Sequence, residues 1–277
     1  MRLRKPRIAL IGAGRMGGSL LRGWAVNGGF APEGSVLVVD PNCSDSISQL
    51  VEENSGRVVA STDKDSLTKL EVLVLAVKPQ IFNEVAHKLA PMLPKDVLII
   101  SIIAGTTIDR ISNLFGPRAI VRAMPNIAAE IGKSVTVICN NSEVNSKHTE
   151  KVDRLLGAVG SLEHIEDERL MDAVTAVSGS GPAYFFLLVE ALAAAGQAEG
   201  LPEALARKLA SETLIGSGSL FEARQQTPSS IRADVTSSGG TTAAALDVMM
   251  GNGAFAEMIR NAVSAATRRS IHLRNSG

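Results

Sequence analysis

The sequence predicts an α/β protein, with a doubly wound sheet in its N-terminal part and an all-α C-terminal part. Three observations lead to this fold class. Short apolar runs alternate with helical patterns as far as residue 165, which is typical of a parallel sheet covered by helices on both faces. The first run leads into a glycine-rich turn, and strand patterns cease beyond residue 165. The chain is therefore expected to change there from alternating strands and helices to helices alone.

The strands are predicted from runs of Val, Ile, Leu and Ala that are bounded by turn residues. They are expected at residues 7–11, 35–39, 57–60, 71–77, 96–102, 119–123 and 134–138. Helical patterns occupy most of the gaps between them, at 15–27, 44–54, 81–91 and 107–115. Because the apolar runs are continuous rather than alternating, we expect both faces of the sheet to be buried.

The C-terminal part is predicted to consist of helices joined by short turns. Gly200 can end one helix, and Pro202 suits the first turn of the next. This part is rich in Ala and Gly and poor in aromatic residues. A second copy of the chain is therefore expected to cover its apolar faces in a homodimer, with a self-contained bundle as the alternative. The helices are expected at 167–199, 202–224, 242–250 and 253–273.

Composition excludes several classes of function. The chain has 28 basic and 28 acidic residues in 277, so its net charge favours neither nucleic acid nor an anionic membrane as a partner. The four histidines and two cysteines lack metal-ligand spacing, and no metal site is expected. The basic start runs directly into the first strand. No apolar run is expected to reach the length of a bilayer-spanning helix, and the most apolar stretch contains Glu190. We therefore expect a soluble, cytoplasmic protein without a membrane span.

The glycine-rich turn has the spacing of a dinucleotide-binding loop. In "IGAGRMG" the glycines follow a strand and open a helix, an arrangement that brings a pyrophosphate close to the backbone at the helix N-terminus. This predicts a Rossmann-like, dinucleotide-binding domain over residues 1–165, followed by a helical domain over 166–277. The cofactor-binding residues expected in the loop are Ile11, Gly12, Ala13, Gly14, Arg15, Met16 and Gly17.

The ends of later strands carry further candidate cofactor-binding residues, because ligands of such sheets lie at the carboxyl ends of the strands. Asp40 ends the second strand, where a carboxylate favours the free ribose of NADH, whereas Arg15 could receive the 2′-phosphate of NADPH. Either cofactor therefore remains possible. The amide of Asn126 is expected to meet the nicotinamide or its ribose. The complete set after the second strand is Asp40, Ala76, Val77, Lys78, Pro79, Ala104 and Asn126.

A second cluster of small polar residues lies in the helical part. The stretch "VTSSGGTTAAAL", residues 235–246, places five hydroxyl groups and two glycines at the start of a helical pattern. Glycines let backbone N–H groups converge, and a helix N-terminus favours negative charge. The stretch therefore predicts an anion-binding site, with a well-capped loop as the alternative.

Several motifs together resemble the Δ1-pyrroline-5-carboxylate reductase family, and they span nearly the whole chain. They are "IGAGRMG" (11–17), "AVKP" (76–79), "MPN" (124–126), "AVSGSGPAY" (176–184) and "DVTSSGGTTAAAL" (234–246). The resemblance implies an NADPH- or NADH-dependent enzyme that transfers a hydride to the C=N bond of a cyclic imino acid, giving L-proline. It also implies a homodimer, with further assembly into higher homo-oligomers in some members.

The resemblance assigns roles to the second cluster. It implies that Ser237, Gly239, Gly240 and Thr241 hold the substrate carboxylate and that Thr242 is the catalytic residue, hydrogen-bonded to the ring nitrogen. A reductase of another cyclic imine acid and a non-catalytic dinucleotide-sensing dimer are alternatives. A β-hydroxyacid dehydrogenase is a third, but such enzymes typically use a lysine in the helical domain. Lys208 is the only lysine after Lys151, and it has no recognisable catalytic setting.

Overall fold

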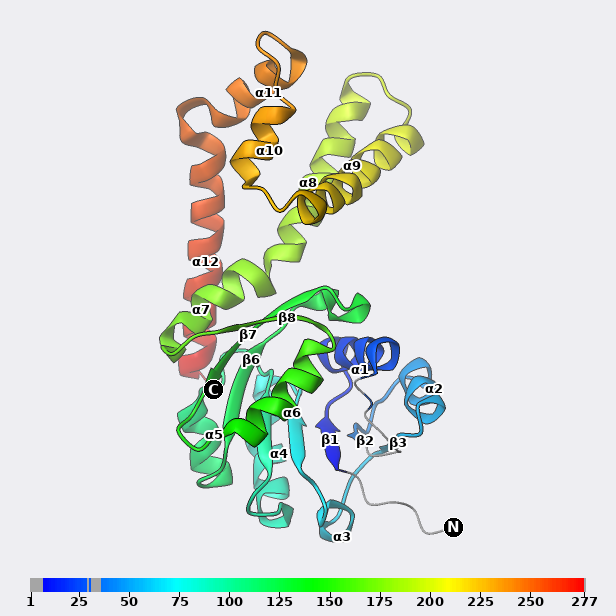
Figure 1. Ribbon diagram of the computed structural model, residues 1–277, viewed down its shortest axis with the longest axis vertical. Coiled ribbons are helices and arrows are strands. Elements are labelled where there is room, and N and C mark those ends of the chain that lie inside the picture. The colour runs from blue at the N-terminus through cyan, green and yellow to red at the C-terminus, as the bar shows by residue number, and fades with distance from the viewer. Residues whose placement is uncertain (1–6, 29, 31–35, 277) are drawn as a thin grey trace. The chain divides into compact units, whose positions relative to one another are not determined.

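The computed structural model describes residues 7–28, 30 and 36–276 (Figure 1). The chain forms two compact units. The first unit comprises residues 1–180 together with 266–277, and the second unit comprises residues 181–265. The predicted basic start, up to residue 6, and the predicted strand start at residue 35 lie outside the described residues.

The first unit is built on one eight-stranded sheet with the order β3-β2-β1-β4-β5-β6-β7-β8. β1 pairs in parallel with both β2 and β4, so the strand order reverses direction there. Such a switch point opens a ligand crevice at the carboxyl ends of the strands. The strands are β1 (Ile8–Ile11), β2 (Val36–Val39), β3 (Arg57–Val59), β4 (Val72–Leu75), β5 (Leu98–Ser101), β6 (Ile120–Met124), β7 (Ser134–Asn140) and β8 (Gly160–His164).

The seven predicted strands are confirmed, but the far edge of the sheet differs from the expectation. β7 runs antiparallel to β6, which makes the sheet mixed rather than parallel. β8 was not predicted, because "GSLEH" has a single aliphatic residue and lies half-exposed at the edge. Gly160 starts this strand with φ +145°, and a Cβ atom there would collide with the Ser134 carbonyl oxygen. An edge strand pairs with one neighbouring strand only, so it needs no continuous apolar run.

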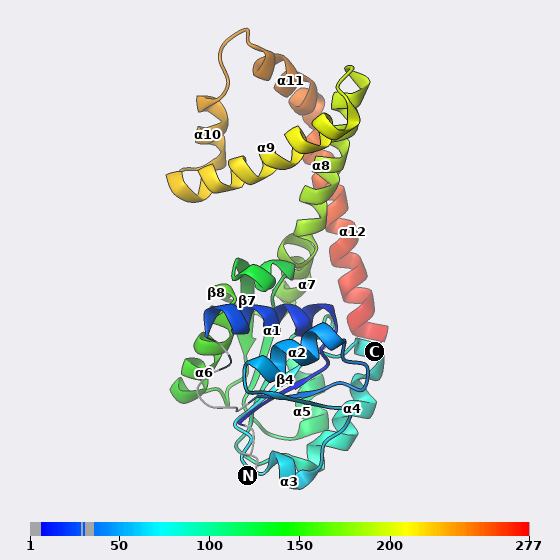
Figure 2. The same cartoon turned by 90° about the vertical axis from the view of Figure 1, so that its right-hand side faces the viewer.

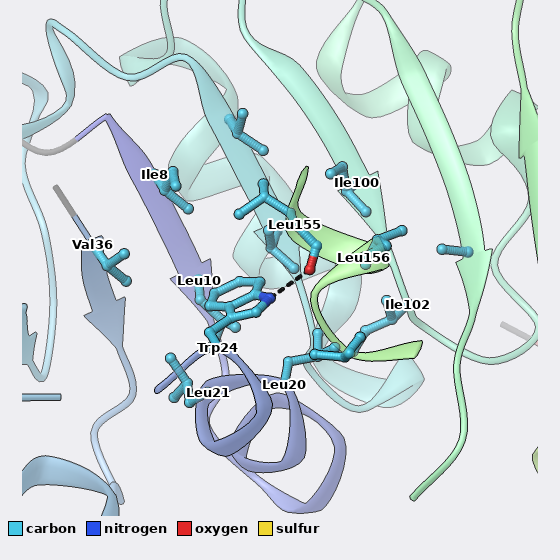
Figure 3. Packing of buried hydrophobic residues seen from close by; sticks show 14 of the residues in the cluster. Ile8, Leu10, Leu20, Leu21, Trp24, Val36, Ile100, Ile102, Leu155 and Leu156 are labelled. Carbon is cyan, nitrogen blue, oxygen red and sulfur yellow. Dashed lines mark hydrogen bonds between the residues drawn. The ribbon is translucent and has the colours of Figure 1, made fainter. Parts of the chain in front are cut away.

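Helices cover both faces of the sheet, which confirms the doubly wound arrangement. Figure 2 shows α6 and α4 on opposite sides of it. On the α6 side, the buried Trp24 ring lies among the aliphatic residues of the core, and its Nε1 donates to the Leu155 carbonyl at 2.7 Å (Figure 3). The short α3 and the polar α6 were not predicted. The helices are α1 (Arg15–Asn27), α2 (Asp45–Glu53), α3 (Lys64–Leu67), α4 (Phe82–Leu89), α5 (Ile108–Phe115) and α6 (Ser146–Gly157).

The helical part begins with an interruption that the sequence pattern did not indicate. A π-helical turn over Thr175–Gly179, here called the π-turn, separates α7 from α8. α10 was also not predicted, although Thr227 accepts a hydrogen bond from Ser230 N at 3.2 Å and Pro228 opens the helix. The helices are α7 (Met171–Val174), α8 (Gly181–Ala198), α9 (Glu203–Arg224), α10 (Pro228–Asp234), α11 (Thr241–Met250) and α12 (Ala254–Ser276).

The last turns of α12 belong to the first unit. Asp172 of α7 is buried, and its carboxylate accepts hydrogen bonds from Ser270 Oγ at 2.7 Å and Arg274 Nη1 at 2.6 Å. The change from strands to helices falls near residue 165 as expected, since β8 ends at His164. The compact first unit extends further, to residue 180, and takes up the end of the chain. The domain ranges 1–165 and 166–277 remain a prediction.

One helical segment among the described residues, 168–198, is long and apolar enough to cross a membrane by length and composition alone. The expectation that no segment would reach this length is therefore wrong. Only 17% of its most apolar window is buried within the chain. The exposed side chains include Phe185, Phe186 and Leu187. An exposed apolar helix of this kind also suits an interface between subunits.

Candidate functional site

The glycine loop has the geometry that a dinucleotide-binding turn requires. Gly12 adopts φ +93°, its N–H donates to the Val39 carbonyl at 3.0 Å, and a Cβ atom there would lie 2.9 Å from the Ala76 carbonyl oxygen. A Cβ atom at Gly17 would collide with the Gly12 carbonyl. At Gly14, by contrast, a Cβ atom would meet nothing within 4 Å beyond the adjoining residues of the loop and helix. Two of the glycines therefore permit close packing, whereas the third leaves open space for a ligand.

The N-terminus of α1 is open to an anion. Gly14 is its N-cap residue, no side chain caps the first turn, and that turn contains no acidic residue. Arg15 is exposed at the first helical position. Uncapped N–H groups beside a guanidinium suit a pyrophosphate or a phosphate ester. The described residues therefore fit a dinucleotide cofactor.

Asp40 shapes the loop as well as ending β2. Its Oδ2 accepts from Ala13 N at 2.7 Å, and its Oδ1 accepts from Asn42 N at 2.8 Å. The side chain is half-buried. Each carboxylate oxygen has a second lone pair, so a ribose hydroxyl can still bind. Sequence reasoning missed the loop-shaping contact, because Ala13 and Asp40 are joined only through the pairing of β1 with β2.

The strand ends bring the other predicted cofactor residues to the same edge of the sheet. After β4, Ala76 N donates to the Ile11 carbonyl at 2.9 Å, and Lys78 is exposed. Val77 and Pro79 are half-exposed neighbours, and Ala104 is half-buried before Gly105, which has φ +70°. β1, β4 and β5 are mutually parallel, so their carboxyl ends lie together.

Asn126 follows β6 at this edge, but its amide is already bound within the protein. Its Oδ1 accepts from Ala128 N at 3.1 Å, and its Nδ2 donates to the Ser178 carbonyl at 3.2 Å. The residue is 8% exposed. These contacts give each polar atom of the side chain a partner within the protein, and a contact of the amide with the nicotinamide stays a prediction.

The second predicted cluster lies in the second unit, at the start of α11. Gly239 adopts φ +69°, Gly240 N donates to the Ser237 carbonyl at 3.1 Å, and a Cβ atom at Gly240 would collide with Ser237 Oγ. Gly240 is the N-cap of α11, and no side chain caps the first turn. The capped-loop alternative therefore does not describe this turn. Ser237 and Thr241 are exposed, and Thr242 is partly buried.

α10 holds the approach to this cluster in place. Thr236 Oγ1 donates to the Arg232 carbonyl at 2.6 Å, and Arg232 Nη1 lies 3.3 Å from Met250 Sδ at the end of α11. Asp234 pairs with Arg224 Nη1 at 2.9 Å. These contacts tie the turn between α10 and α11 to three helices of the second unit. A tight turn followed by an uncapped helix end has backbone N–H groups that suit an anion.

A buried ion pair was missed at the sequence level. Arg122 on β6 is 1% exposed, and its Nη1 donates to Glu168 Oε1 at 2.7 Å. The same oxygen accepts from Ile108 N, at the start of α5, at 2.9 Å. The signal in the sequence is an arginine inside an otherwise apolar strand, "AIVRAM". Among the described residues, no three His, Cys, Asp or Glu side chains gather as a metal site.

Comparison with known families matches both parts of the chain. Residues 168–273 match the family model described as pyrroline-5-carboxylate reductase dimerisation. Residues 7–105 match the model described as NADP oxidoreductase, coenzyme F420-dependent. The two matches cover the helical part and the glycine-loop part, respectively.

Full-length relatives give the same result. The pyrroline-5-carboxylate reductase of Pseudomonas aeruginosa is 38% identical and covers 97% of each chain, and that of Synechocystis is 39% identical over 96% of this chain and 98% of the relative. A solved pyrroline-5-carboxylate reductase from Coxiella burnetii is 30% identical with a TM-score of 0.86, over 98% and 99% of the two chains. The NADP-bound enzyme of Plasmodium falciparum is 28% identical with a TM-score of 0.83, over 98% and 99%. This protein belongs to the pyrroline-5-carboxylate reductase family.

Proposed function

We propose that this protein reduces Δ1-pyrroline-5-carboxylate to L-proline with NADPH or NADH. The observation that carries the proposal is the uncapped start of α11, preceded by the tight Ser237–Gly240 turn, in a chain of this family. A cyclic imino acid has one carboxylate, which this turn can bind through converging N–H groups. The glycine loop of the first unit supports the cofactor part of the proposal in the same way.

The cofactor would be held by the strand ends of the first unit. The open position at Gly14 and the α1 N-terminus suit its pyrophosphate, and Lys78 and Arg15 are exposed cations at this edge. When bound, the reduced nicotinamide supplies the hydride that the imine carbon accepts. Asp40 favours a free ribose and Arg15 favours a ribose phosphate, so the preference between NADH and NADPH depends on their balance.

The substrate would be held by the second cluster. Ser237 and the N–H groups of Gly239 and Thr241 bind the carboxylate, while Gly240 N holds the turn by donating to the Ser237 carbonyl. The Thr242 hydroxyl orients the ring nitrogen. A threonine hydroxyl is too weak an acid to protonate that nitrogen, so the proton comes from solvent or arrives on the substrate. Holding the two reacting carbons about 3–3.5 Å apart supplies much of the rate acceleration. Positioning of this kind requires neither a histidine side chain nor a metal ion.

The same proposal includes the assembly and location predicted from sequence. The match of residues 168–273 to a dimerisation model and the exposed apolar side chains of α8 support a homodimer, with higher homo-oligomers as a further step. The cytoplasmic location stays a prediction from the sequence.

The test is oxidation of reduced nicotinamide, followed by its absorbance, with purified protein and Δ1-pyrroline-5-carboxylate. Thr242→Ala is expected to lower kcat/KM while the Kd for NADPH stays unchanged, and Ser211→Ala, on the exposed surface of α9, is the matched control. A six-membered cyclic imino acid, added as a competing substrate, tests the alternative that the enzyme reduces another cyclic imine acid. No turnover by wild-type protein that binds NADPH would refute the reductase and favour the sensing dimer.

A further inference from the structure

Asn126 connects two sequence motifs by bonding to a residue 52 positions further along the chain. Its backbone N–H donates to Ser134 Oγ at 3.0 Å, and its side-chain Oδ1 caps the turn at Ala128. The other polar group of its side chain, Nδ2, donates to the Ser178 carbonyl at 3.2 Å. Asn126 ends the "MPN" motif, and Ser178 lies in "AVSGSGPAY". The carboxamide therefore ties the end of β6 to the π-turn.

The carbonyl group of Ser178 loses its usual helical partner. In a regular helix it would accept from the N–H of the fourth residue onward, but that residue is Pro182, which has no N–H. The helix widens here, and Ser180 N donates to the Thr175 carbonyl at 2.9 Å, five residues back. A partly buried carbonyl that has lost its helical partner is costly, so the Asn126 amide, which donates to it, stabilises the widened turn.

A second contact places the π-turn against the same strand. Met124, the last residue of β6, is 7% exposed, and its Sδ lies 3.5 Å from where a Cβ atom of Gly179 would be. β6 pairs in parallel with β5, so its end belongs to the edge that carries the cofactor residues. π-Helical turns of this kind are frequent at functional sites.

We propose that Asn126 is a positioning residue of the reductase, which holds the π-turn at the carboxyl edge of β6 as one wall of the nicotinamide end of the cofactor site. The inference rests on the proposed function, since it takes this edge as the cofactor site. Asn126 acts through the Ser178 carbonyl rather than by touching the cofactor. This role differs from the direct contact with the nicotinamide or its ribose that the sequence predicts for the Asn126 amide.

The variant Asn126→Asp separates this role from capping. Aspartate keeps an oxygen that accepts from Ala128 N, but it replaces the donor Nδ2 with a second oxygen facing the Ser178 carbonyl. Asn126→Ala removes both contacts. We therefore expect N126D to resemble N126A, with kcat lowered about tenfold or more through misplacement of the π-turn. The Kd for NADPH should change less than about twofold, because the glycine loop is untouched.

Hydrogen exchange of the cofactor-free protein gives a readout independent of turnover. Peptides covering residues 175–180 should exchange about tenfold faster in N126D than in wild type, whereas peptides of α1 should be unchanged. Turnover and exchange in N126D equal to wild type would show that capping alone matters and would overturn the proposal. A loss of NADPH affinity matching the loss of kcat would also overturn it, in favour of direct cofactor contact. Inactive wild-type protein would refute the proposed function instead, while the exchange comparison would still test the link to the π-turn.

Discussion

The buried carboxylate of Asp172 should be a main support of the first unit, and Asp172→Asn tests this. Asp172 is 2% exposed and binds Ser270 and Arg274 at 2.7 and 2.6 Å. Breaking a fully buried ion pair costs about 3–5 kcal/mol. The Arg274 side chain is 26% exposed, and asparagine keeps one acceptor oxygen. Discounting for both, we expect a loss of about 2 kcal/mol in the free energy of unfolding.

Trp24 makes this measurable in the first unit alone, because it is the only tryptophan and is completely buried there. A loss of about 2 kcal/mol corresponds to a fall in Tm of about 4–8 °C for a unit of this size. Trp24 fluorescence monitors the thermal unfolding. Asp167→Asn is the matched control, since its exposed pair with Arg169 should change Tm by less than about 1 °C. Equal Tm values for the two variants would refute the reasoning.

Three further predictions follow from burial and backbone geometry. Burial raises the pKa of the Cys139 thiol, so alkylation at pH 8 should modify the half-buried Cys43 before Cys139. Mass spectrometry locates the modified cysteine, and equal labelling of the two would contradict this. Burial lowers the pKa of His148, so the unfolded chain binds a proton on this side chain more tightly than the folded protein does. The free energy of unfolding, measured by urea titration, should therefore fall as pH drops below about 6.5. It should fall less steeply in His148→Gln. Gly14→Ala should weaken NADPH binding about tenfold without changing Tm, whereas Gly12→Ala, at φ +93°, should cost about 1–3 kcal/mol of stability.

The first part of the fold could be predicted because its signals are local. β1 is a run of four buried aliphatic residues, and the glycines after it are required by the turn itself. The start of α11 was also predictable, to within one residue, from glycines and hydroxyl groups before an alanine run. Each of these features depends on residues within about one turn of one another in sequence.

The missed features depend on pairing between distant residues. β8 has few apolar side chains because it pairs with β7 alone. The direction of β7 follows from the short connection after β6, which the alternation of strands and helices did not reveal. The second role of Asp40, as acceptor for Ala13 N, arises only once β1 and β2 are neighbours. Composition cannot indicate such contacts, because the same residues would suit an exposed loop.

The segment that joins the sheet to α8 shows why distant contacts matter for function. Glu168 binds the buried Arg122, Asp172 binds the end of α12, and the Ser178 carbonyl binds Asn126. Each of these groups is polar and at least partly buried, so each needs a partner that local structure does not supply. The three partners come from β6, from α12 and from the turn after β6. The sequence pattern of this segment predicts the start of one long helix, but the three contacts fix it to the first unit. They explain why that unit continues to residue 180 and includes the end of the chain.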